Sequence, residues 1–193
     1  YMIAFVLGLA VPIAFLFVAE LLNDKIRNKA DLDLLTTAPI LGEVGHSESE
    51  KTLIITTKDR KFISEQFRIL RTNLQYILPI KKSTNTLLVT SSISGEGKSF
   101  ISTNIAAVMA VSGKKTVILE FDIRKPKVMK GLGLDHKKSK GISNYLVGKA
   151  TIEDIIQAVP NVENLYVIPC GPIPPNPAEL ILNDRLLKLF EAV

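Results

Sequence analysis

The sequence lacks tryptophan and contains one cysteine, Cys170, among its 193 residues. A single cysteine excludes a disulfide within the chain and fits a reducing compartment. Because Cys170 ends an apolar run, we expect a buried thiol without a catalytic role. The two histidines, His46 and His136, lie in polar segments and are expected to be solvated loop residues rather than metal ligands.

Charge of both signs is present, with a net charge of +5 and an isoelectric point near 9.3. This excess of positive charge is compatible with phosphates, acidic partners or anionic lipid, and by itself it selects none of them. We predict no nucleic-acid partner.

The longest apolar segment covers residues 1–22, where no charged residue precedes Glu20. About 20 apolar residues are needed to cross a bilayer, so we predict a membrane-spanning helix here. Basic residues follow at once: Lys25, Arg27 and Lys29. They place the following residues on the cytoplasmic side. The alternatives are a signal peptide, whose basic residues would come first, and a buried core helix. Because the chain starts at Tyr1 inside the apolar run, we expect it to be part of a longer protein.

The remainder is predicted to be an irregular connector over residues 23–60 and a C-terminally incomplete domain over residues 61–193. A helix is expected over residues 61–78, ended by Pro79. Its core-facing stripe has helical spacing and consists of Ile63, Phe67, Leu70, Leu74 and Ile77.

A strand over residues 86–91, a helix over 99–111 and a strand over 116–121 form a predicted βαβ unit. Such a unit implies an α/β fold, with a parallel sheet flanked by helices. Further on we expect a short helix from a capping box at Thr151, a strand over 165–169 and a last helix capped by Asn176.

The segment from Ser92 to Ser99 fits the phosphate-binding P-loop pattern except that Ser92 replaces the first glycine. In such loops the backbone N–H groups wrap the β-phosphate, the lysine reaches the β- and γ-phosphates, and the serine hydroxyl binds Mg²⁺. We therefore predict ATP with magnesium. The predicted nucleotide-binding residues are Ser94, Gly95, Glu96, Gly97, Lys98, Ser99 and Phe100. A chance glycine-serine turn is the alternative, which the predicted strand before the loop and helix after it disfavour.

A second polar group, Glu120, Asp122 and Arg124, follows the predicted strand over 116–121. Strand ends face the ligand crevice of an open α/β sheet, and a carboxylate there can hold Mg²⁺ or accept a proton. We predict Lys98, Asp122 and Arg124 as catalytic residues. The predicted magnesium ligands are Ser99, Asp122 and Glu120. The alternative is a polar strand end whose acid and arginine pair with each other.

The chain resembles the bacterial tyrosine kinases, the autokinases of capsule and exopolysaccharide assembly. Four features carry the resemblance: the P-loop, a Walker A′-like segment over residues 117–124, a helix motif with Glu65, Arg68 and Arg71, and a proline-rich segment over 171–180. The resemblance implies an ATP-dependent tyrosine autokinase at the bacterial inner membrane, with its kinase domain in the cytoplasm. It also implies polysaccharide polymerase and export machinery as partners.

The resemblance further implies ring-like self-association through Glu65, Arg68 and Arg71. These residues lie off the core stripe, beside an apolar line of Phe62, Ile69 and Tyr76. A solvated face with a local Glu65–Arg68 pair is the alternative.

The sequence differs from the family's pattern in two respects, and two other functions are alternatives to a kinase. Glu120 stands where the family usually has aspartate, so Asp122 is the preferred magnesium ligand. The family's Walker B aspartate and tyrosine-rich tail would lie beyond residue 193. One rival is a partitioning-type (ParA/MinD-like) regulatory ATPase, which would carry a second lysine where this chain has Ile93. The other is a nucleotide-binding membrane adaptor without kinase activity.

Overall fold

The structure is a computed structural model of the whole chain. It describes residues 1–23, 26, 28–49, 51–56, 62–78, 84–122, 125–134, 139–173, 179–180 and 182–193. The chain forms two units, Tyr1–Ile40 and Leu41–Val193. The second unit therefore begins earlier than the domain start predicted at residue 61.

The first unit contains helices α1 (Met2–Leu21) and α2 (Lys29–Leu35). Within the described part of the chain, no helix combines the length and apolarity that crossing a membrane requires. A helix thus forms in the predicted place, but the membrane span predicted over residues 1–22 is not supported. Helix α2 lies in the predicted irregular connector. It begins with a capping box, in which Asn28 Oδ1 accepts the Asp31 N–H at 3.0 Å and Asp31 Oδ2 accepts the Asn28 N–H at 3.2 Å.

The second unit is built on a three-stranded sheet in the order β1-β3-β2. Strands β1 (Thr116–Leu119) and β3 (Leu165–Ile168) are parallel, as predicted. Strand β2 (Gln157–Ala158) is antiparallel to β3, so the wholly parallel sheet predicted from the sequence is wrong. The physical reason is the short link over residues 159–164, because a parallel connection needs a crossover of a dozen or more residues.

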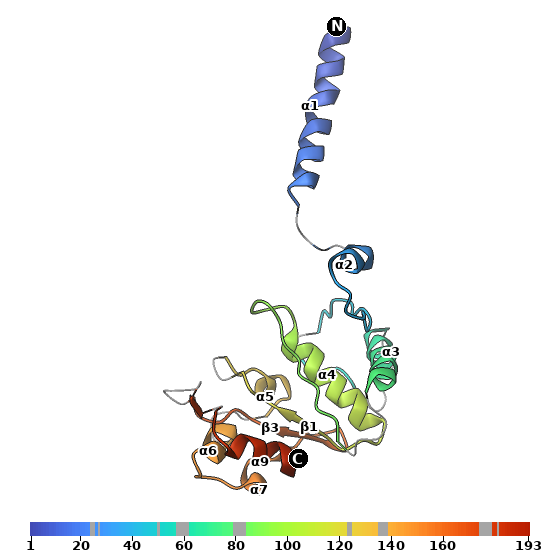
Figure 1. Cartoon of the computed structure of the whole chain (residues 1–193). Coiled ribbons are helices and arrows are strands. Elements are labelled where there is room, and N and C mark those ends of the chain that lie inside the picture. The colour runs from blue at the N-terminus through green and yellow to red at the C-terminus, as the bar shows by residue number, and fades with distance from the viewer. Residues whose placement is uncertain are drawn as a thin grey trace. The chain divides into compact units, whose positions relative to one another are not determined.

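Helices cover both faces of this sheet (Figure 1). On one face lie α3 (Phe62–Ile77), α4 (Lys98–Val111) and α5 (Val128–Gly131), whose apolar side chains share a core cluster with Ile118 and Val167. On the other face lie α6 (Ile142–Leu146), α7 (Ile152–Ile155) and α9 (Arg185–Ala192), packed on Ile168. Neighbouring strand residues point to opposite faces, which explains why Val167 and Ile168 belong to different clusters.

Two predicted helices of this unit are confirmed almost to the residue. Helix α3 buries Phe67, Leu70 and Leu74 of its predicted stripe, while Ile77 at its end remains 55% exposed. Helix α4 ends before Gly113, whose φ of +89° lies in the left-handed region that glycine favours. The predicted Asn176 cap and Pro79 lie outside the described residues, and the described last helix begins at Arg185.

The strand predicted over residues 86–91 does not form. Residues 84–91 belong to none of the described strands, and the side chains of Leu87 and Leu88 are 45% and 84% exposed. Strand propensity reflects packing on a pleated, half-buried surface, and this segment has no such surroundings here. The predicted βαβ unit therefore consists only of α4 and β1 in the structure.

Part of the predicted connector is integral to the second unit. Ile54 and Ile55 are buried in the core cluster beside α4. The fully buried Asn104 of α4 holds them, since its Oδ1 accepts the N–H groups of Ile54 at 3.0 Å and of Ile55 at 3.2 Å. Its amide also donates to the Thr52 carbonyl at 2.7 Å. Helix α4, whose first turn carries Lys98, is thereby fixed to a second chain segment.

Candidate nucleotide site

The predicted phosphate loop is an exposed turn that leads directly into α4. Gly95 and Gly97 have φ angles of +103° and +91°, which side chains with a Cβ rarely adopt. A Cβ at either glycine would meet no atom within 4 Å, so the conformation rather than crowding requires glycine here. Helix α4 starts at Lys98 without a side-chain cap, which leaves its first N–H groups available to an anion.

Glu96 holds the beginning of this loop. Its Oε2 accepts the backbone N–H groups of Ser92 at 2.9 Å and Ile93 at 3.2 Å. A carboxylate that accepts two backbone N–H groups closes the turn through charge-assisted hydrogen bonds. The sequence pattern predicted Glu96 only as a nucleotide-binding position and gave no sign of this role.

The structure brings two predicted catalytic residues together. Lys98 Nζ lies 3.3 Å from Asp122 Oδ2, and both side chains are about one third exposed, at 36% and 34%. Asp122 Oδ1 also accepts the backbone N–H of Lys125 at 3.1 Å. The loop lysine and the aspartate after β1, 24 positions apart in sequence, therefore meet at the carboxyl end of that strand.

Glu120 has a different environment from Asp122. It is 2% exposed, and its Oε1 accepts the N–H of Val128, the first residue of α5, at 2.6 Å. Its Oε2 is buried and has no hydrogen-bond partner among the described residues. Glu120 thus anchors the start of α5, and its predicted part in magnesium binding stays a prediction.

Cys170 is buried, as predicted, two residues after β3. Burial, with smaller contributions from the negative charges of Glu120 and Asp122, raises the pKa of its thiol to about 11. The thiol therefore stays protonated at neutral pH, which fits a packing role.

Ser99 and Asp122 are the two side chains whose oxygen atoms would bind a magnesium ion at this site. Hard cations such as Mg²⁺ prefer oxygen ligands and usually keep several waters, so one hydroxyl and one carboxylate suit the ion. Among the described residues, no group of three or more histidine, cysteine or acidic side chains could form a complete protein cage. Phe100 packs into the core, with its ring 5.8 Å from that of Phe67, so only its backbone could serve the predicted nucleotide contact.

The predicted oligomerisation residues Glu65, Arg68 and Arg71 lie on α3. Arg124 is outside the described residues. On α3, Arg68 Nη1 lies 2.8 Å from Glu65 Oε2, so the local pair forms. Arg71 is half-buried, and its Nε has no partner among the described residues. The pair does not test the predicted interface, because such pairs also occur on solvated helices.

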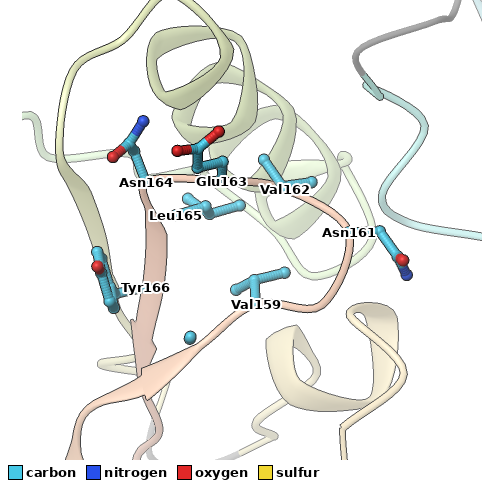
Figure 2. Close-up of a pocket in the computed structure, with 8 residues that line it drawn as sticks. Val159, Asn161, Val162, Glu163, Asn164, Leu165 and Tyr166 are labelled. Carbon is cyan, nitrogen blue, oxygen red and sulfur yellow. The ribbon is translucent and has the colours of Figure 1, made fainter.

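A separate open pocket of about 490 Å³ is formed by the link between β2 and β3 and the adjoining strand residues (Figure 2). It is lined by Ala158, Val159, Asn161, Val162, Glu163, Asn164, Leu165 and Tyr166. This pocket is at the amino end of β3, whereas Lys98 and Asp122 meet at the carboxyl end of β1, which runs parallel to it. The nucleotide-binding features are therefore outside this pocket.

Comparison with known proteins places the chain in a family. No protein-family model matches the chain. The tyrosine-protein kinase YwqD of Bacillus subtilis is 36% identical over 147 residues, covering 76% of this chain and 60% of that protein. The putative tyrosine-protein kinase CapB of Staphylococcus aureus is 38% identical over 138 residues, covering 72% and 59%. The crystal structure of the chimerical protein CapA2B2 matches with a TM-score of 0.75 and 32% identity, over 86% of this chain and 70% of that one.

The chain belongs to the bacterial tyrosine-protein kinase family. This confirms the resemblance seen in the sequence. The chain spans 60% and 59% of the length of the two kinases compared above, so it corresponds to part of each. In this member of the family, the loop over residues 92–99 and Asp122 form the candidate nucleotide site.

Proposed function

We propose that this chain carries the nucleotide site of an ATP- and magnesium-dependent tyrosine autokinase, an enzyme that phosphorylates tyrosines of the same protein. The observation that supports the proposal is the 3.3 Å contact between Lys98 Nζ and Asp122 Oδ2, which joins the phosphate loop to the strand end. Phosphoryl transfer needs two such groups together: a cation that contacts the phosphates, and a carboxylate that binds magnesium or accepts a proton.

The chemistry assigned to these residues is simple. Magnesium held by Ser99 and Asp122 would neutralise charge between the β- and γ-phosphates. When the tyrosine hydroxyl attacks, its proton passes to a carboxylate such as Asp122 and its oxygen bonds to the γ-phosphorus. The bond from that phosphorus to the bridging oxygen breaks, and ADP leaves. Arg124 would stabilise the charge on the transferred group.

Lys98 must exchange Asp122 for phosphate oxygens when ATP binds. Both side chains are about one third exposed, and ion pairs at such positions contribute about 0–1 kcal/mol. The exchange is therefore inexpensive, and the pair keeps the ammonium group close to the loop before the nucleotide arrives.

Self-association through α3 is part of the proposal. Beside the Glu65–Arg68 pair, the apolar line predicted from the sequence is exposed: Phe62 at 77%, Ile69 at 53% and Tyr76 at 85%. Exposed aromatic and aliphatic side chains beside charges are typical of protein interfaces. Ring-like homo-oligomers, a place at the inner membrane and action on capsular or exopolysaccharide polymerisation and export follow from the family resemblance.

The test is incubation of the full-length protein with γ-labelled ATP and magnesium, followed by phosphoamino-acid analysis. We expect label on tyrosine, lost in Lys98→Met. ATP hydrolysis without phosphotyrosine would favour a partitioning-type ATPase. Nucleotide binding without either activity would favour a membrane adaptor. Either result would refute the kinase proposal.

A further inference from the structure

Three lysines follow the strand end that carries Asp122: Lys125, Lys127 and Lys130. All three are exposed. Within the described part of the chain, none of their ammonium groups forms an ion pair, whereas Lys98 pairs with Asp122 and Lys140 with Asp154. This lysine cluster is therefore available to an external anion.

Buried groups hold the lysine cluster in place. Glu120 Oε1 accepts the N–H of Val128 at 2.6 Å and so fixes the start of α5 to the end of β1. Val128 and Met129 are 7% and 0% exposed and anchor the helix in the core. Since these residues are buried, the exposed side chains lie on either side of them: Lys127 is the N-cap of α5, and Lys130 follows three positions later within the helix.

The lysine cluster is also tied to the nucleotide site. The backbone N–H of Lys125 donates to Asp122 Oδ1 at 3.1 Å, and Asp122 Oδ2 lies 3.3 Å from Lys98 Nζ. One carboxylate thus links the phosphate loop to the first lysine of the cluster. A polypeptide that brings a tyrosine hydroxyl to Asp122 therefore comes close to Lys125, the first lysine of the cluster.

We infer that Lys125, Lys127 and Lys130 dock an acidic stretch of the polypeptide that carries the tyrosine to be phosphorylated. The inference rests on the proposed kinase function and adds a substrate class to it. Charge complementarity supports it, because clustered cations beside a site raise the local concentration of anionic segments. It also predicts strong salt dependence, since contacts between exposed charges are screened over about 10 Å at 0.1 M salt.

The experiment uses the full-length protein and two fluorescent peptides, each with one tyrosine, flanked either by glutamates or by glutamines. The test variant is Lys127→Glu plus Lys130→Glu. The control is Lys114→Glu plus Lys115→Glu, which has the same charge change at the opposite end of β1, where both lysines are exposed. We measure peptide affinity by anisotropy, and kcat/KM for tyrosine phosphorylation.

We expect the wild type and the control pair to favour the glutamate peptide about tenfold in both measurements, and the test pair to lose this preference. Phosphorylation of the glutamine peptide should be the same in all three proteins. Equal affinity of the wild type for both peptides, or an equal loss in the control pair, would overturn the docking inference. So would tighter binding of single-stranded DNA or of anionic lipid vesicles than of the acidic peptide. Lysine-dependent peptide binding without phosphotyrosine would instead refute the kinase function and leave the docking surface intact.

Discussion

Replacing Glu120 separates its role as an anchor of α5 from the role as magnesium ligand predicted from the sequence. In Glu120→Ala the N–H of Val128 loses its acceptor in a buried position, because Val128 is 7% exposed. A buried donor without a partner costs about 1–3 kcal/mol. In Glu120→Gln the amide oxygen can still accept this N–H, and we expect stability within about 1 kcal/mol of the wild type.

The assay pairs urea unfolding with calorimetric titration of ATP in saturating magnesium. The structure predicts that Glu120→Ala unfolds at lower urea concentration, while its ATP affinity in the folded state changes less than about threefold. That fold-change corresponds to less than about 0.7 kcal/mol, well below the cost of losing a direct metal ligand.

The opposite pattern would refute this account of Glu120. If Glu120→Ala keeps wild-type stability and loses magnesium-dependent ATP affinity, the carboxylate is a metal ligand despite its burial. Asp122→Asn serves as the comparison. Because Asp122 is more exposed than Glu120, we expect its substitution to affect the nucleotide site rather than stability.

Three further predictions concern the core, the thiol and the α3 surface. Phe67 is fully buried, so Phe67→Ala should cost about 3–5 kcal/mol in urea unfolding, whereas the exposed Phe62→Ala should cost little. Because the folded-state pKa of Cys170, about 11, exceeds its ordinary 9.0, the wild type should lose about 2 kcal/mol relative to Cys170→Ala as the pH rises from 9 to 11. Parallel pH dependences would contradict the raised pKa. Arg68→Ala plus Arg71→Ala should weaken self-association and keep nucleotide affinity; unchanged oligomers by light scattering would rule out that interface.

The sequence predicted those features that local patterns determine. The glycines and Lys98 predicted a turn with positive φ that leads into a helix, and the structure has this turn before α4. The apolar stripe of α3 and the capping box at Thr151, which opens α7, are likewise local signals. The expectation that Lys98 and Asp122 lie close together rested on the rule that strand ends in such sheets line one crevice. Asp122 does follow β1, whereas no strand forms over residues 86–91 before the loop.

Features that depend on distant partners could not be predicted in this way. The segment over residues 86–91 has strand propensity, yet it is not paired in the structure. Glu120 and Asp122 were both predicted as magnesium ligands, and the sequence does not show that their surroundings differ. One is buried against the N–H of Val128, and the other lies beside Lys98, so tertiary packing alone separates their roles. The bonds of Asn104 to Ile54 and Ile55 join segments about 50 positions apart and have no local signature.

The central claim is that Lys98 and Asp122 act together in transfer of phosphate to tyrosine. The most direct measurement is the single-turnover rate of phosphotyrosine formation in the full-length Asp122→Asn variant, with ATP affinity determined alongside. We predict a rate lower by about 10²–10⁴-fold, the usual contribution of a positioned proton acceptor, while the variant still binds ATP. Phosphotyrosine formation at the wild-type rate in Asp122→Asn would contradict the account.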